Sequence, residues 1–416
     1  MTFHPKKAVF AGAAFLIGLL TQTSVNVVGN MPLAEFVVLA VVAVTVATAA
    51  VGKHISAALF RMPLFWVFAI AQIVAFTAYV VSDISRGSAA NDMLRGWSRM
   101  IFLGVDIVAI TWLFGAAESC FLWLQAGLMC GGLLATILEG AQFDAYWKFG
   151  LGGPATVALL LVSPFFGRLT CIVLVGAMGV VHLALDFRSM GGVCLLVAML
   201  LSVLCIPRQF RASLLVPGII GGTVFTFWLN SQQRAGDDGR ASRSTVERTA
   251  MYVAAWQGFA ESPLIGQGSW FSNSRVLDNF QLLRSEGARL AGVHGYAVET
   301  EETAIAIHSQ FLVSIAEGGI FGGTFFLVFG TMLMWSLWYC TVRRDADTRT
   351  PIFIFFLLNA LWNLLFSPFS GAHRIGIATG CGLIFLLWRE AHGTAAAESE
   401  PEPAEENQTE LCGTHS

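Results

Sequence analysis

The stretch HSQFLVSIAEGGIFGG, residues 308–323, lies where a long polar loop gives way to an apolar segment. Residues 319–341 are apolar enough to form a complete membrane span on their own. A helix running unbroken from His308 through that span would contain about 35 residues and measure ~50 Å, against a hydrocarbon core of ~30 Å. We therefore expect His308 to stand about 16 Å beyond the start of the span, on an extramembrane extension of the helix.

The composition of the whole chain is that of a membrane protein. Of its 416 residues, 56% are hydrophobic and only 12% are charged, whereas a soluble domain usually carries about 25% charged residues. The formal net charge of −3 gives no reason to expect nucleic acid or a strongly acidic partner. The cysteines lie in apolar stretches or in the C-terminal tail without zinc-ligand spacing, so we expect neither a disulfide framework nor a metal or other cofactor.

Apolar runs along the chain predict an all-α, polytopic membrane protein, because each run approaches or reaches the length of a membrane-spanning helix. The sixth run, which begins at a Gly-Pro pair, is the shortest. The twelve runs are 8–24, 33–51, 63–82, 98–116, 119–138, 153–167, 169–185, 190–206, 212–230, 319–341, 351–367 and 374–389.

The distribution of basic residues predicts the orientation of these spans. With the N-terminus inside, eleven lysine and arginine residues fall on the cytoplasmic side and six in the short outer turns, which agrees with the positive-inside rule. The chain then divides into nine spans (1–230), an outward-facing loop with the candidate functional helices (231–318), three further spans (319–390) and an acidic, disordered cytoplasmic tail (391–416).

The large loop contains one segment that is predicted to be helical. Ser244–Glu247 has the spacing of a capping box, so a helix should start there and end near Glu261. Arg248 would lie in its first turn, where the helix dipole favours an anion, and would share a face with Tyr252 and Phe259, an aromatic surface suited to stacking on a sugar. The structural alternative is a solvated arginine on an amphipathic helix.

Three further polar residues are candidates on the predicted outer side. His308 is the best general base, because its ordinary pKa is near neutrality, although a histidine at a helix start is more often a cap or a satisfied polar residue. Glu317 lies nine residues further on, about half a turn out of phase with His308, so we expect a structural hydrogen-bonding group. Arg188 lies in the tight turn LDFRSMGG at the level of lipid head groups, where it is either an anion ligand or an interfacial anchor.

These residues carry a resemblance. HSQFLVSIAEGGIFGG resembles the signature of the O-antigen ligase and polymerase superfamily, in which histidine and a small polar residue are followed by nine residues and then Gly-x-x-Gly. The matching residues in this chain are His308, Ser309, Gly319 and Gly322.

Two upstream segments extend the resemblance. ERTAMYVAAWQGFAESPLIGQGSWF is similar to the family's arginine, amphipathic stretch and Pro-Leu-x-Gly-x-Gly turn, and LDFRSMGG is similar to its arginine-bearing turn, with Phe187 replacing the usual serine. The motif detail covers roughly residues 180–345. The residues that match are Arg188, Arg248, Pro263, Leu264, Gly266 and Gly268.

The resemblance implies a GT-C-like glycosyltransferase in a bacterial inner membrane, with a periplasmic active site and membrane lipids as its surroundings. The donor would be a glycan on undecaprenyl diphosphate, and the acceptor a sugar hydroxyl on lipid A–core or a growing glycan. His308 would be the base in an inverting reaction that needs no metal, since no Asp-x-Asp pair lies on the predicted outer face. The arginines expected to bind the diphosphate are Arg188 and Arg248, with Arg86, Arg95 and Arg374 as weaker candidates on the same side.

Other functions stay open at this point. The compact loop and the His-Ser pair favour a ligase over an O-antigen or exopolysaccharide polymerase, which would use the same donor. A transporter of lipid-linked glycans would bind lipid phosphates without chemistry, but transporters usually place polar residues near the membrane midplane and show repeated halves. A membrane scaffold is a lesser alternative.

Overall fold

The computed structural model describes residues 5–26, 30–50, 62–139, 146–214, 217–218, 220–221, 224, 240–270, 274–290, 307–369 and 371–399. Two short strands, β1 (Ser24–Asn26) and β2 (Asn30–Pro32), pair antiparallel. The α-helices are α1 (Pro5–Leu20), α2 (Ala34–Ala50), α4 (Pro63–Arg86), α5 (Ala90–Ala116), α6 (Ser119–Glu139), α7 (Gly152–Val162), α8 (Arg168–Ala184), α9 (Arg188–Val203), α11 (Arg240–Glu261), α12 (Ser274–Leu290), α13 (Gln310–Gly322), α14 (Thr324–Trp338), α15 (Thr350–Phe366) and α16 (Gly371–Ser399).

The helices confirm the all-α fold class of a polytopic membrane protein. Among the described residues, six helices are long and apolar enough to cross a bilayer, and five shorter apolar helices coincide with other predicted spans. The short sixth run is part of a longer span, Trp147–Phe166, in which α7 continues from a π-helical turn. The predicted span 212–230 lies largely outside the described residues.

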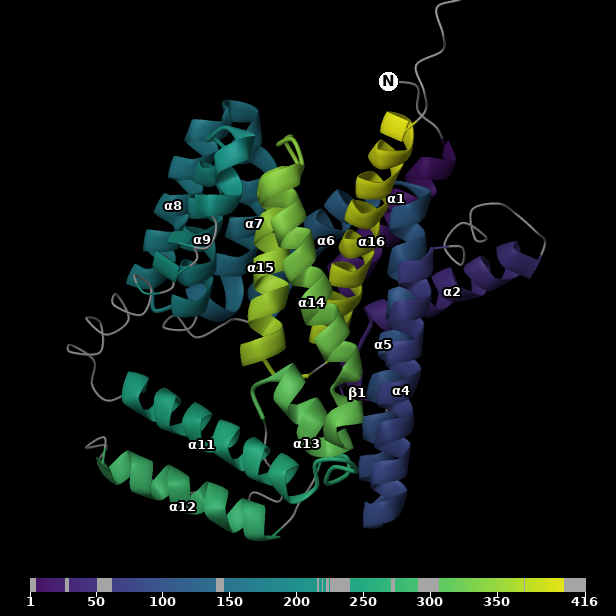
Figure 1. Cartoon of the computed structure of the whole chain (residues 1–416), viewed down its shortest axis with the longest axis vertical. Coiled ribbons are helices and arrows are strands. Elements are labelled where there is room, and N and C mark those ends of the chain that lie inside the picture. Colours follow the sequence, from purple (N-terminus) through teal and green to yellow (C-terminus); the bar gives the residue numbers. More distant parts are fainter. Residues whose placement is uncertain are drawn as a thin grey trace, which may run out of the picture.

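The two ends of the bundle differ in character. In Figure 1, α1 begins and α16 ends at one end of the bundle, whereas α11 and α12 lie across the other end, beside α13. The hairpin of α4 and α5 also extends toward this second end, where α4 packs against α13. We call this second end, formed by α11, α12, α13 and the tip of the α4–α5 hairpin, the loop end.

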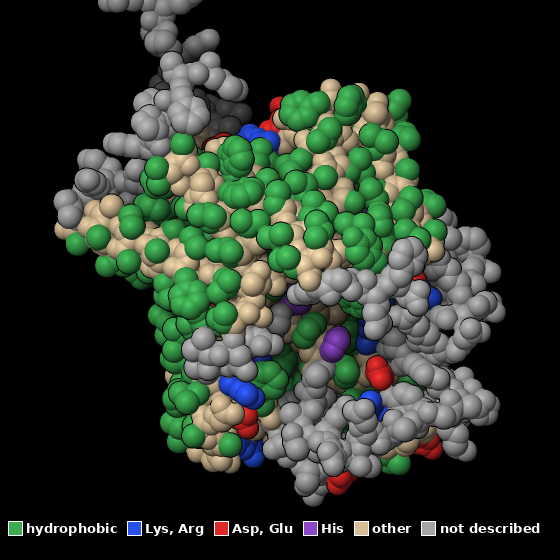
Figure 2. Space-filling model, turned by 180° about the vertical axis from the view of Figure 1, so that it is seen from behind, with side chains coloured by type: hydrophobic (Ala, Val, Ile, Leu, Met, Phe, Trp, Pro, Cys, Tyr) green, Lys and Arg blue, Asp and Glu red, His purple; other side chains and the backbone are tan. Residues whose placement is uncertain are grey.

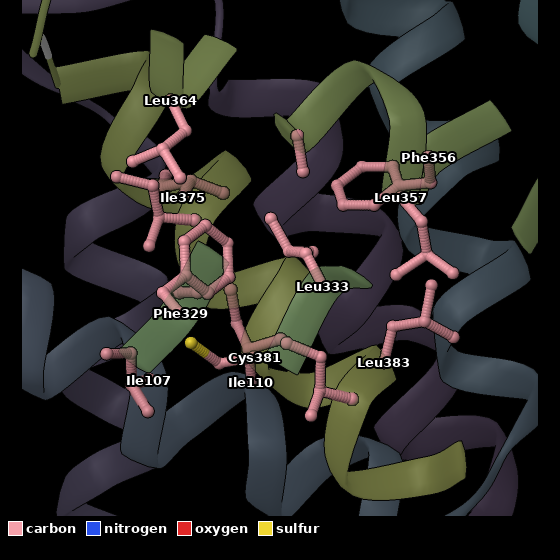
Figure 3. Close-up of a cluster of buried hydrophobic side chains, with 14 of the residues drawn as sticks. Ile107, Ile110, Phe329, Leu333, Phe356, Leu357, Leu364, Ile375, Cys381 and Leu383 are labelled. Atoms are coloured by element: carbon pink, nitrogen blue, oxygen red, sulfur yellow. The ribbon is translucent and has the colours of Figure 1, made fainter. Parts of the chain in front are cut away.

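Close helix contacts hold the apolar part of the bundle together. A Cβ atom on Gly127 would lie 2.1 Å from the carbonyl oxygen of Phe15, and one on Gly131 would lie 2.3 Å from that of Leu19. These two glycines, four residues apart on α6, therefore let its backbone touch that of α1. Such close contacts commonly join helices in a membrane, because the hydrophobic effect gives little driving force for association in lipid. Figure 3 shows the core between α5, α14, α15 and α16, which contains Ile107, Ile110, Phe329, Leu333, Phe356, Leu357, Leu364, Ile375, Cys381 and Leu383.

The predicted unbroken helix from His308 to residue 341 is wrong. Gly319 has φ 65° and ψ −165°, which breaks the helix, and the membrane-spanning part is Thr324–Arg343. A Cβ atom on Gly319 would lie 2.4 Å from the carbonyl oxygen of Leu264, so a loop segment packed against the break requires glycine there. The length-based estimate of how far His308 stands from the membrane therefore does not hold.

The C-terminal boundary also differs from the prediction. The tail was expected to begin at residue 391, but α16 continues to Ser399. Alanine-rich sequence extends a helix at little cost, which explains the added turns. The rest of the predicted disordered tail, 400–416, lies outside the described residues.

Candidate functional site

The turn that follows α11 is held against the break in α13 by backbone hydrogen bonds. The N–H of Gln267 donates to the carbonyl oxygen of Ala316 at 2.9 Å, and that of Gly268 donates to the carbonyl oxygen of Glu317 at 3.0 Å. On the other side, the N–H of Ile320 donates to the carbonyl oxygen of Pro263 at 2.8 Å. The Pro-Leu-x-Gly-x-Gly motif and the Gly-x-x-Gly motif are thus two halves of one contact.

The glycines of the turn have left-handed backbone conformations. Gly266 has φ 85° and Gly268 has φ 87°, a region that side-chain-bearing residues rarely adopt. A Cβ atom on Gly266 would lie 2.2 Å from the carbonyl oxygen of Glu317. Both conformation and space therefore require glycine, and the motif residues Pro263, Gly266 and Gly268 shape the fold of the site.

Glu317 is buried and joins three elements. Its carboxylate forms an ion pair with Arg99 of α5 and accepts a hydrogen bond from the N–H of Trp270 at 2.9 Å. Its backbone oxygen also accepts from the hydroxyl of Ser82 at 2.7 Å. These contacts agree with a structural role for Glu317, as its phase relative to His308 indicates.

A second buried carboxylate, Asp83 of α4, was missed by sequence reasoning. It accepts hydrogen bonds from the N–H of Ser269 at 2.6 Å, the hydroxyl of Ser269 at 2.8 Å and the indole N–H of Trp97 at 2.8 Å. We call the set Asp83, Arg99, Ser269, Trp270 and Glu317 the α13 clamp. The sequence signal for it was a carboxylate and an arginine at the edges of two predicted apolar runs, 63–82 and 98–116, which would also fit interfacial anchors.

His308 immediately precedes α13 and is half-buried. The helix is capped by Ser309, whose hydroxyl oxygen accepts from the N–H of Leu312 at 3.2 Å and whose hydroxyl is 3.4 Å from the carbonyl oxygen of Leu364. The capping role proposed as the alternative for His308 therefore belongs to Ser309.

Two charged residues of α11 act electrostatically on His308. Burial lowers the pKa of His308 below its ordinary value; the positive charge of Arg248 lowers it further, whereas Glu247 raises it. His308 also interacts electrostatically with His373 at the start of α16, and Arg248 with Tyr252. A histidine with a lowered pKa is neutral near pH 7 and can accept a proton. In Figure 2, histidine side chains lie in a hollow between the apolar body and the charged loop end.

The start of α11 corrects one expectation. The helix begins at Arg240, so Ser244 is not its N-cap and Arg248 lies in the third turn, away from the free N–H groups of the helix start. Arginine, alanine and serine before Ser244 extend the helix without strain, which the capping-box spacing alone did not indicate. Arg248 is exposed and lies within electrostatic reach of His308, because α11 packs against α13.

Arg188 is the first residue of α9 and forms an ion pair with Asp186, with 2.9 Å between Nε and Oδ1. The turn before it is fixed by His182: Trp147 donates to Nδ1 of His182 at 2.9 Å, and Thr156 lies 2.7 Å from Nε2. The backbone N–H of Phe187 donates to the carbonyl oxygen of His182 at 2.8 Å. His182 is thus a satisfied core histidine that holds the turn carrying Arg188.

The weaker arginine candidates occupy different surroundings. Arg374 is buried and forms an ion pair with Glu35 at 2.7 Å. The Nε of Arg86 donates to the carbonyl oxygen of Gly266 at 2.9 Å, and Arg95 is exposed on α5. Arg374 and Arg86 therefore have structural partners, whereas Arg95 is open to solvent.

The separate effects of Arg248 and Glu247 on the pKa of His308 can be tested. Arg248→Gln should raise the pKa of His308, because a nearby positive charge is lost, and Glu247→Gln should lower it further. The imidazole would then protonate at higher pH in the first variant and at lower pH in the second. NMR titration of histidine-labelled protein measures both shifts, and two shifts of the same sign would contradict this electrostatic arrangement.

Helices suited to crossing a bilayer, with a charged cluster at one end, define a multi-pass membrane protein. Residues 173–327 match the family model described as O-antigen ligase. This segment runs from within α8 to the start of α14 and includes Arg188, Arg248 and His308. The match confirms the resemblance to the O-antigen ligase and polymerase superfamily. No curated protein sequence matches the chain at a significant level.

Proposed function

We propose that this chain is a glycosyltransferase that moves a glycan from undecaprenyl diphosphate to a sugar hydroxyl of lipid A–core, on the periplasmic face of the bacterial inner membrane. The observation that carries the proposal is the placing of His308 beside Arg248, with the pKa of the imidazole lowered by burial and by that arginine. The family match supports the broad activity.

The proposed chemistry uses the imidazole of His308 and the guanidinium groups of two arginines. The acceptor oxygen attacks the anomeric carbon, the bond from that carbon to the phosphate oxygen breaks, and the diphosphate leaves with the electron pair. His308 takes the proton of the acceptor hydroxyl. Arg248 and Arg188 stabilise the charge that develops on the diphosphate, because guanidinium groups are permanently charged and can contact phosphate through two N–H donors. Attack from the face opposite the diphosphate inverts the anomeric configuration.

A polymerase would use the same donor and the same groups, and would differ in the acceptor. Deleting the gene and separating the cell's lipopolysaccharide on a gel distinguishes the two. A ligase predicts core without O-antigen, together with accumulated long undecaprenyl-linked glycan. Core capped by a single repeat unit would indicate a polymerase, and unchanged lipopolysaccharide with lost exopolysaccharide would indicate a polymerase of that polymer.

If the arginines bind the diphosphate through two N–H donors each, a positive charge alone should not be sufficient for full activity. Arg188→Lys and Arg248→Lys keep a positive charge but lose the planar two-donor contact, so each should reduce transfer at least about tenfold. Arg343→Lys, on an exposed arginine at the opposite end of the bundle, is the matched control and should remain near wild type. Initial rates with a defined donor measure the effect. Full activity of both lysine variants would contradict two-donor binding of the diphosphate.

A further inference from the structure

Arg248, in the third turn of α11, and His308, just before α13, both lie away from the α13 clamp, where the two helices meet. Arg248 is fourteen residues before Ser262, where α11 has ended, which corresponds to ~21 Å of helix at ~1.5 Å per residue. α13 begins nine residues before the break at Gly319, which corresponds to ~14 Å of helix, and His308 lies two residues before that start. α11 and α13 are in contact, so their relative angle affects the separation of the guanidinium and the imidazole.

The clamp attaches both helices to the tip of the α4–α5 hairpin. Asp83 satisfies three donors from the turn after α11 and from α5, and is fully buried. A Cβ atom on Gly96 would lie 2.0 Å from the hydroxyl oxygen of Ser269, so α5 approaches the turn as closely as a glycine permits. The turn is therefore fixed from the α4–α5 side, independently of its backbone hydrogen bonds to α13.

The α13 side of the clamp is equally well packed. The guanidinium of Arg99, paired with Glu317, lies 5.6 Å from the ring centroid of Tyr79, 5.5 Å from that of Trp270 and 4.9 Å from that of Phe369. A cation surrounded by aromatic rings and a carboxylate has one well-defined position. Arg99 thus fixes the broken part of α13 to α5 while Asp83 fixes the end of α11 to the same hairpin.

We propose that the α13 clamp is a positioning device that sets the separation of Arg248 and His308, with Asp83 as its principal positioning residue. The inference rests on the proposed function for its kinetic consequence. A rotation of α11 by about 5° about the clamp would move a residue ~21 Å away by ~1.8 Å. Misplacement by ~1 Å can cost about 100-fold in rate, so a small loss of rigidity at Asp83 has a large effect at Arg248.

The test is Asp83→Asn in the full-length protein. The amide keeps the shape, but its NH₂ group faces donors, so at least one hydrogen bond is lost. Spin-label amino acids at Thr249 on α11 and Leu365 at the end of α15, both exposed, report the angle of α11. We expect a shifted or broadened distance distribution, and kcat reduced about tenfold or more, with the KM for the donor within about threefold of wild type. Ser269→Ala, which removes one of the three hydrogen bonds, should show a smaller change in the same direction and serves if Asp83→Asn does not fold.

Asp347→Asn is the matched control, because Asp347 also accepts several hydrogen bonds but belongs to the loop between α14 and α15 at the opposite end. It should lower stability and leave the distance distribution and kcat unchanged. A wild-type distance distribution in Asp83→Asn, or an altered one with unchanged kcat, would overturn the proposal. The distance measurement needs no turnover, so it decides the role of the clamp even if the wild-type protein transfers no glycan and the proposed function fails.

Discussion

Replacing His308 with alanine should reduce glycan transfer by about 10²–10⁴-fold, the usual contribution of a general base. Folding should be little affected, because Ser309 rather than His308 caps α13, and the imidazole is only half-buried. Donor binding should also persist, since the diphosphate is assigned to arginines. Initial rates and donor affinity, measured on the same purified protein, separate these expectations.

Ser309→Ala provides the matched control next in sequence. It removes the cap of α13, which should cost about 1 kcal/mol of stability, but it keeps the imidazole. The expected pattern is therefore low activity with normal stability in His308→Ala, and lowered stability with substantial activity in Ser309→Ala. A His308→Ala variant that retains more than about a tenth of the wild-type rate would contradict the assignment of the base.

The largest expected effect on stability is that of Glu317→Ala. The change leaves the buried guanidinium of Arg99 without its carboxylate and the N–H of Trp270 without its acceptor. Breaking a buried ion pair by removing one partner typically costs about 3–5 kcal/mol. Unfolding of the detergent-solubilised protein, followed by denaturant or heat, measures the loss.

An exposed ion pair supplies the comparison for Glu317. Glu118 pairs with Arg349 and Arg389 at 3.0 Å each, but its side chain is 53% exposed. Glu118→Ala should therefore cost at most about 1 kcal/mol. If Glu317→Ala were no more destabilising than Glu118→Ala, burial of the α13 clamp would be less complete than the structure indicates.

Hydropathy predicted most of the membrane helices, because length and apolarity are local properties of the sequence. The break at Gly319 could not be predicted in the same way. Glycines in apolar segments are common within membrane helices, and this break depends on a contact with Leu264, more than fifty residues earlier. The break was therefore visible only once the turn after α11 had been placed.

In the candidate site, too, some residues could be predicted from the sequence and others could not. His308 and Arg248 could be selected from residue chemistry and motif resemblance, and the structure places them within electrostatic reach of each other. Asp83 and Arg99 could not, because partners of theirs lie 186 and 218 residues away and each is a charge at the edge of a predicted apolar run. The start of α11 was misjudged because a favourable capping sequence can also occur within a helix.

The central claim, transfer of a glycan by groups of this chain on the outer face of the membrane, is tested most directly by reconstitution. Purified protein in liposomes is given a defined undecaprenyl-diphosphate glycan and lipid A–core in buffer containing EDTA. The account predicts a lipid A–core glycan whose new bond has the inverted anomeric configuration, with release of undecaprenyl diphosphate and no product from His308→Ala. A product with retained configuration, or equal transfer by His308→Ala, would contradict it.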